Sequence, residues 1–174
     1  MPVSVAIASA HLGAEGCTHD ESSGGTKSSA AGSVSATKCA TPLPDASPQG
    51  TGLCGGPCDF SSAQLSFVSA SPSTTHVQIG DVALLDADTG MELQALSAYT
   101  PLVWDGTQYS PWDENVSPFS QIKTSYTLSP PAWSMLGPSF TYSHQYQVRI
   151  TVLVDGVALP LESPPLTRPA RLST

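Results

Sequence analysis

The clearest pattern in the chain is an alternation of apolar and polar residues between positions 142 and 154. Its apolar face consists of Tyr142, His144, Tyr146, Val148, Ile150, Val152 and Val154. Its polar face consists of Gln145, Gln147, Arg149 and Thr151. This alternation predicts a long half-buried β-strand. Asp155-Gly156 then forms a favoured hairpin turn, and residues 157–161 return as a partner strand. Pro160 places that partner at a sheet edge, because proline lacks an amide donor.

Shorter alternations precede this hairpin and predict further strands. Val77 and Ile79 share one phase, whereas Val82 and Leu84 share another, so the shift at Gly80-Asp81 predicts a β-bulge. Residues 85–91 form a predicted hairpin turn. Further strands are predicted around residues 65–69, 91–95, 101–104, 107–110 and 120–128. Pro130-Pro131 ends the last of these.

No segment carries the apolar spacing of a helix over three turns, so the fold class is all-β. About seven strands with frequent turns predict an antiparallel, immunoglobulin-like β-sandwich. The segment 146–152, the Asp155-Gly156 turn and a candidate core tryptophan, Trp133, resemble the Ig-like and fibronectin type III-like domains of exported bacterial surface proteins. The resemblance covers about residues 60–170 and lacks the inter-sheet cysteine pair of antibody domains. It implies adhesion, assembly or ligand presentation.

The sequence divides into three parts. Residues 1–59 are predicted to form a long irregular arm or tether, rich in Gly, Ser and Pro, because stretches such as 22–33 contain no large apolar residue. An ordered arm that docks on the domain or on a neighbouring subunit is the alternative. Residues 60–168 form the sandwich domain, and residues 169–174 form a tail.

The low content of charged residues bears on the function and on the cellular compartment. Only 11% of the residues are charged, and the net charge is −8 with six basic residues. Without a basic patch, binding to nucleic acid or to an anionic membrane surface is not expected. An uncharged polar surface is common in exported proteins, which predicts an extracellular or cell-surface location. No apolar run is long enough for a transmembrane helix.

The four cysteines lie in the predicted arm, at Cys17, Cys39, Cys54 and Cys58. An even number of cysteines in such a segment predicts disulfides formed in an oxidising compartment, with the pairing left open. Two alternatives remain. Thiolates and His19 could bind zinc, which takes four nitrogen or sulfur ligands. Cys17 follows a short apolar segment and precedes a Ser/Gly-rich stretch, a layout that suits a lipid anchor on that cysteine.

Three acidic residues around the first predicted hairpin have the spacing of a calcium loop. Calcium prefers six to eight oxygen ligands, and Asp86, Asp88 and Glu92 offer three carboxylates within seven residues. The alternative is ordinary turn chemistry, since aspartate side chains cap tight turns. No cofactor is expected from the sequence; calcium at this turn is the alternative, beside zinc at the cysteines. Asp113-Glu114, beside Asp105, forms a second acidic loop.

Four aromatic residues in the central loops form the best candidate binding patch: Trp104, Tyr109, Trp112 and Phe119. Aromatic side chains supply large rigid contact areas for a protein or a sugar. The alternative is that they close one end of the core. His144 is interpreted as a hydrogen-bonded histidine at the rim of its strand. The sequence contains no nucleophile elbow, phosphate loop or dinucleotide fingerprint, so no enzymatic activity is expected.

The sequence therefore predicts a non-catalytic, exported structural or interaction module, with a protein partner or self-assembly. Two alternatives stay open. The chain could be a subunit of an extracellular or viral-type assembly, such as a fibre subunit or a capsid decoration protein. It could also be a carbohydrate-binding module that uses the aromatic loop.

Overall fold

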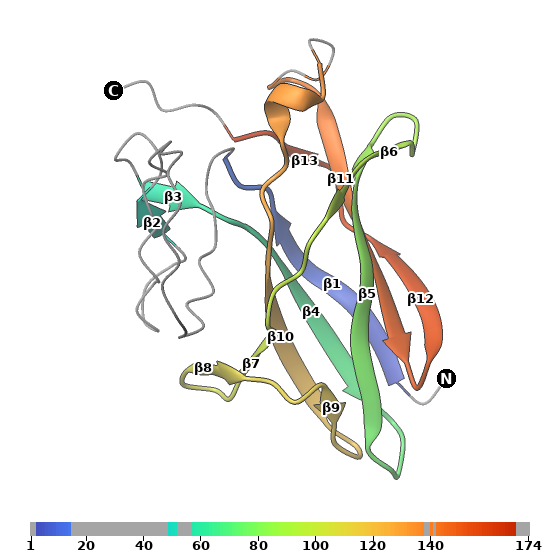
Figure 1. Ribbon diagram of the computed structural model, residues 1–174. Coiled ribbons are helices and arrows are strands. Elements are labelled where there is room, and N and C mark those ends of the chain that lie inside the picture. Colours follow the sequence, from blue (N-terminus) through green and yellow to red (C-terminus); the bar gives the residue numbers. More distant parts are fainter. Residues whose placement is uncertain (1–2, 15–48, 52–56, 138–139, 141, 170–174) are drawn as a thin grey trace, which may run out of the picture.

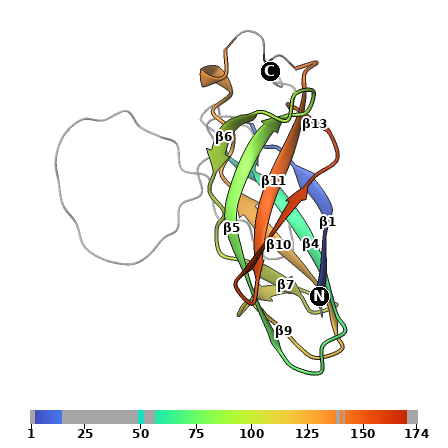
Figure 2. The same cartoon turned by 90° about the vertical axis from the view of Figure 1, so that its right-hand side faces the viewer.

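Two antiparallel β-sheets pack against each other and form a β-sandwich, which confirms the predicted all-β class (Figure 1). The computed structural model describes residues 3–14, 49–51, 57–137, 140 and 142–169. Figure 2 shows the two layers from the side, with β5, β11 and β12 in front of β1, β4 and β10. Within the described residues, no helix is long and apolar enough to span a membrane.

The first sheet has five strands in the order β1-β4-β10-β7-β8. Their bounds are β1 Val3–His11, β4 Ser61–Ser69, β10 Gln121–Leu128, β7 Leu102–Trp104 and β8 Tyr109–Pro111. Every second residue of β4, from Ser61 to Ser69, is buried, and the residues between them are partly or fully exposed. The sheet therefore turns one face toward the core and the other toward solvent, as antiparallel sheets commonly do.

The second sheet contains β12, β11, β5 and β6 in that order. Their bounds are β12 Val157–Glu162, β11 Gln145–Val154, β5 Thr75–Asp86 and β6 Glu92–Leu96. Two short strands extend it: β13 (Leu166–Thr167) pairs with β11, and β9 (Asn115–Val116) pairs with β5. A separate hairpin joins β2 (Gln49–Thr51) to β3 (Pro57–Asp59). A short 3₁₀ helix, Trp133–Met135, precedes β11.

The long strand and hairpin predicted at the end of the sequence are confirmed, but the strand begins at Gln145, and Tyr142, predicted on its apolar face, is 43% exposed. Every second residue of β11, from Tyr146 to Val154, is buried, as the alternation predicted. Asp155 and Gly156 both have positive φ, at 47° and 80°, which is the backbone of a two-residue hairpin turn. β12 is an edge strand, as Pro160 indicated.

The predicted β-bulge is also confirmed. Ile79 pairs with Val152 and Val82 pairs with Ile150, so both Gly80 and Asp81 lie opposite Thr151. A Cβ atom on Gly80 would lie 3.4 Å from the carbonyl oxygen of Thr151. The bulge therefore explains why the apolar phase of β5 changes in mid-strand and still leaves Val77 and Val82 in one core.

The start of the predicted arm needs a correction. Residues 3–11 form β1, which pairs with β4 in an antiparallel register, and Val3 and Leu12 are buried in the core. The period-two spacing of Val3, Val5 and Ile7 suits a strand, but a single short apolar segment before a long polar one gave no hairpin signal. Residues 15–48, which make up most of the predicted arm, lie outside the described residues.

The number of long strands agrees with the prediction, although their positions differ in part. Of the thirteen strands described, seven have five or more residues, namely β1, β4, β5, β6, β10, β11 and β12. The six others have two or three residues; β7 and β8 confirm the short strands predicted around residues 101–104 and 107–110, and β2 and β3 form the separate hairpin. The sequence did not predict β2, β3, β9 or β13, because strands this short carry few positions from which a period of two can be recognised.

Trp133 is the core tryptophan that the sequence suggested, with only 2% of its surface exposed. Its ring packs edge-on against Tyr146 at a centroid distance of 5.0 Å. Its indole N–H donates a buried hydrogen bond of 2.9 Å to the carbonyl oxygen of Gly13. The guanidinium of Arg168 lies 5.1 Å from the same ring. Trp133 thus joins the residues that follow β1 to the end of the second sheet.

Candidate functional site

The turn between β5 and β6 is organised by Asp86, the last residue of β5. Its carboxylate accepts hydrogen bonds from the backbone N–H groups of Asp88, at 2.8 Å, and of Thr89, at 3.3 Å. The N–H of Gly90 donates to the Asp86 carbonyl oxygen at 2.8 Å, and Gly90 has a φ of 70°. Aspartate and glycine at these positions therefore fix the turn, as their turn preferences require.

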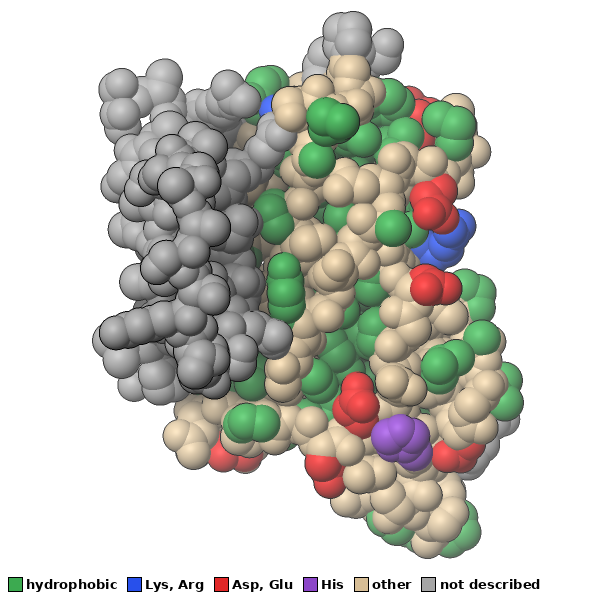
Figure 3. Space-filling model, in the orientation of Figure 1, with side chains coloured by type: hydrophobic (Ala, Val, Ile, Leu, Met, Phe, Trp, Pro, Cys, Tyr) green, Lys and Arg blue, Asp and Glu red, His purple; other side chains and the backbone are tan. Residues whose placement is uncertain are grey.

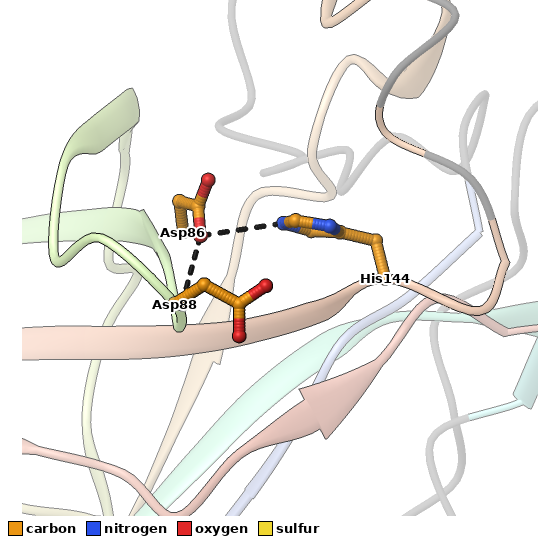
Figure 4. A group of neighbouring side chains, drawn as sticks. All are labelled: Asp86, Asp88 and His144. Atoms are coloured by element: carbon orange, nitrogen blue, oxygen red, sulfur yellow. Dashed lines mark hydrogen bonds and ion pairs between the residues drawn. The ribbon is translucent and has the colours of Figure 1, made fainter.

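His144 reaches the same turn from the start of β11, the strand that pairs with β5 in the same sheet. It stands just before β11, whose residue Tyr146 pairs with Asp86. The Nε2 atom of His144 lies 3.4 Å from a carboxylate oxygen of Asp86 (Figure 4). Its ring meets Phe140 and Tyr146 edge-on, with centroid distances of 5.2 and 5.0 Å. These ring contacts set the direction in which the imidazole points.

The Nε2 atom of His144 is buried and has no hydrogen-bond partner among the described residues. Its side chain is 18% exposed, and that of Asp86 is 9% exposed. The sequence predicts a hydrogen-bonded histidine at the rim of its strand; His144 does lie just before β11, and its Nε2 lies 3.4 Å from the Asp86 carboxylate without the geometry of a hydrogen bond. A buried nitrogen that makes no hydrogen bond costs free energy, and the polar group that faces this one is the Asp86 carboxylate.

Asp86, Asp88 and His144 are the group of described residues whose side chains could hold a metal ion. One ligand atom from each of the three lies within 4.8 Å of the others. Glu92, which the sequence placed in a calcium loop, points elsewhere and forms an ion pair of 2.6 Å with Arg149. The ligand set therefore differs from the predicted one by a histidine in place of a glutamate.

Electrostatics keeps Asp86 ionised. Burial raises the pKa of its carboxyl, but the N–H groups of Asp88 and Thr89 and the nearby His144 outweigh burial and hold the pKa below its ordinary value. Among the described residues, neither Asp86 nor Asp88 forms an ion pair with a lysine or arginine. In the described part of the chain, no lysine or arginine neutralises this carboxylate charge, and His144 is the nearby group that can carry a positive charge.

The aromatic residues predicted to form one binding patch are separated by the fold. Trp112 is only 8% exposed, packs on Phe67 at 5.3 Å and donates its indole N–H to the carbonyl oxygen of Asn115. It is a core residue, as the alternative interpretation held. Trp104 and Tyr109 do meet, on the β7–β8 hairpin, with their rings 5.0 Å apart. Phe119 is 72% exposed and has a positive φ of 51°.

The second acidic loop consists of turn-capping residues. The Asp105 carboxylate accepts hydrogen bonds from the N–H groups of Gln108 and Thr107 and from the Thr107 hydroxyl. Asp113 accepts the N–H of Asn115. These hydrogen bonds lower the pKa of both carboxyls, that of Asp105 chiefly through Gln108 and that of Asp113 chiefly through Asn115. Their geometry is that of aspartates that stabilise turns.

A shallow groove of about 500 Å³ lies where β5 bulges, bordered by Asp81, Glu92 and Arg149. The face of the molecule in Figure 3 carries few charged side chains among polar and hydrophobic ones. This distribution agrees with the low charge content of the sequence.

The predicted disulfides, the zinc alternative and the lipid anchor all depend on residues outside the described part of the chain. Cys17, His19, Cys39 and Cys54 lie outside it, and of Cys58 only the backbone, within β3, is described. These hypotheses stay predictions. No protein-family model matches the chain, and no curated protein matches it. Function must therefore be argued from the described residues alone.

Proposed function

We propose that this protein is a non-catalytic interaction module that works outside the cell or at its surface, and that it binds its partner through the free edge of β1. The observation that carries the proposal is the character of this edge. β1 is a nine-residue strand that, in the described part of the chain, pairs only with β4. Such an edge presents a row of backbone donors and acceptors that another strand can satisfy.

The first part of β1, residues 3–7, lacks the features that normally keep an edge strand from pairing. Residues 3–10 contain neither proline nor a charged side chain. A register shift occurs between Ile7 and Ser9, which leaves residues 3–7 as a regular stretch. Charge, proline and bulges are the usual means by which proteins blunt an exposed edge. Residues 3–7 contain none of the three.

The edge of the opposite sheet provides an internal comparison. β12 lies beside β1 on the same side of the sandwich, and it carries Pro160 and Glu162 (Figure 1). The two strands are thus neighbours, but only one of them carries such blunting residues. This contrast favours a role for β1 in strand pairing, because the other edge strand of the same side does carry residues that hinder pairing.

The proposal is tested with a peptide that has the sequence of residues 3–11 and with the full chain itself. We expect the labelled peptide to bind the protein, and we expect Ala6→Lys, at an exposed edge position, to abolish binding. Val68→Lys is the matched control, since Val68 is 45% exposed on the neighbouring inner strand β4. A scrambled peptide should not bind. If the peptide binds both variants equally, or binds neither variant nor the unmodified protein, β1 is not a docking edge.

A second measurement distinguishes an interaction module from a subunit of an assembly. Sedimentation velocity of the full chain over a range of concentrations reports self-association. A sedimentation coefficient that rises with concentration, and no longer rises in Ala6→Lys, would favour the assembly subunit, in which a second copy supplies the strand. A chain that stays monomeric yet binds the peptide would favour a different partner.

A second candidate function is sugar binding, and one observation supports it. Trp104 is 41% exposed and stands beside Tyr109 on the β7–β8 hairpin, so part of this aromatic pair is accessible to a ligand. Calorimetry against a panel of glycans tests this function. Binding that Trp104→Ala removes would support it, and the absence of binding across the panel would exclude it for the sugars tested.

A further inference from the structure

The β5–β6 turn and the start of β11 bring three ligand side chains together from two distant parts of the chain. Asp86 ends β5, Asp88 lies in the turn, and His144 stands two residues before Tyr146, which pairs with Asp86. Their ligand atoms lie within 4.8 Å of one another. Figure 4 shows the imidazole and both carboxylates close together beside the β5–β6 turn.

Two of these side chains are already held in place. The carboxylate of Asp86 is fixed by the backbone N–H groups of Asp88 and Thr89, and the ring of His144 is fixed between Phe140 and Tyr146. Metal ligands in proteins are typically oriented in this way by hydrogen bonds and packing from surrounding groups. Asp88 is exposed, so only this side chain must move to complete the set.

A separate observation, the environment of the His144 Nε2 atom, also points to a metal ligand here. The Nε2 atom of His144 is buried, faces Asp86 at 3.4 Å and has no hydrogen-bond partner in the described structure. A cation between the imidazole and the carboxylates would accept the lone pair of this nitrogen. It would also neutralise the carboxylate charge, which no lysine or arginine among the described residues balances.

The ligand types select the class of metal. Calcium takes six to eight oxygen atoms, whereas this cluster offers two carboxylates and one imidazole, and Glu92 is engaged with Arg149. Imidazole suits zinc and its first-row neighbours, and zinc also accepts aspartate oxygen. Three protein ligands leave at least one position for water or for a side chain from a partner.

We propose that Asp86, Asp88 and His144 bind one divalent first-row transition-metal ion of the zinc type, which fastens the β5–β6 turn to the start of β11. This site is separate from the β1 edge and does not depend on it. The proposed metal is different from the predicted calcium, and its ligand set contains His144 in place of Glu92.

The test is a titration of the full chain with Co²⁺ and with Zn²⁺ after alkylation of free thiols, so that cysteines do not contribute. We expect one equivalent to bind, with a Co²⁺ absorption spectrum that lacks sulfur charge transfer. Asp88→Ala and His144→Ala should each weaken binding at least about tenfold, since even outer groups of metal sites contribute that much. Asp88 makes no side-chain hydrogen bond in the described structure, so its replacement leaves the turn intact.

Three variants serve as controls: His76→Ala and Asp81→Ala, which remove exposed potential ligands elsewhere, and Glu92→Gln, which removes the predicted calcium ligand. All three should bind the metal as the unmodified protein does. Far-ultraviolet circular dichroism establishes that each variant is folded. Binding that survives both Asp88→Ala and His144→Ala, or no binding up to millimolar metal, would overturn the proposal. Calcium binding that depends on Glu92 would also overturn it and restore the oxygen-ligand loop.

Discussion

The link between Trp133 and Gly13 allows a strong test of the structure, because it joins residues 120 positions apart. Replacement of Trp133 by alanine removes a ring that is 2% exposed and its contact with Tyr146. Such substitutions of buried aromatic residues cost about 3–5 kcal/mol. Since domains of this size are stable by only about 5–15 kcal/mol, this variant should lose a large fraction of its stability.

Trp133→Phe separates the hydrogen bond from the packing. Phenylalanine keeps most of the buried ring but leaves the Gly13 carbonyl oxygen without the indole donor. An unsatisfied buried acceptor costs about 1–3 kcal/mol, so we expect a loss of about 2 kcal/mol. We also expect faster hydrogen exchange along β1, because Gly13 lies just beyond this strand and is no longer anchored to the second sheet.

Urea denaturation measures both effects, as a lower midpoint with an unchanged slope. Trp104→Phe is the control, since Trp104 is 41% exposed and its replacement should change stability by less than about 0.5 kcal/mol. If Trp133→Phe is as stable as the unmodified protein and exchange along β1 is unchanged, then Gly13 is not held by Trp133. The placement of β1 in the sandwich would then need another cause.

Two further predictions concern the central loops. Trp112→Ala should lower the free energy of unfolding by about 3–5 kcal/mol, because Trp112 packs on Phe67 in the core. Trp104→Ala should change it by no more than about 0.5 kcal/mol, because Trp104 is exposed. Chemical denaturation measures both values, and equal effects would contradict the assigned burial. The lowered pKa of Asp105 means that its stabilising contribution is complete above its ordinary pKa of 3.8 and is lost as the pH falls through the lowered value. Melting temperatures between pH 7 and pH 2 should therefore fall less steeply below pH 4 for Asp105→Asn than for the unmodified protein, and parallel curves would refute this role.

The sandwich could be predicted where a strand was long enough to show its period. β11 has ten residues and alternates throughout, and its hairpin turn carries the residues that positive φ requires. The bulge in β5 was visible as a change of phase between Ile79 and Val82. β1 was missed because a single alternating segment, followed by a long polar stretch, gives no local sign of the strand with which it pairs.

The candidate metal site could be predicted only in part, for a related reason. Asp86 and Asp88 belong to one turn, so their proximity follows from local sequence. His144 joins them because β11 pairs with β5 in the register that sets Tyr146 against Asp86. Glu92 follows the same turn at the start of β6, but its side chain reaches across β5 to Arg149 on β11. Sequence spacing carries no information about such cross-strand partners.

The sequence by itself determined the class of fold, the turns and the alternation of each long strand, because these depend on neighbouring residues and on the backbone preferences of glycine, proline and aspartate. Only the tertiary structure decided that residues 3–11 complete a sheet, that Trp112 is buried while Trp104 is exposed, and that His144 meets Asp86. These outcomes depend on the order and register of strands that are distant in the chain. A one-residue change of register would turn each side chain to the opposite face, and local sequence does not specify which strands become neighbours.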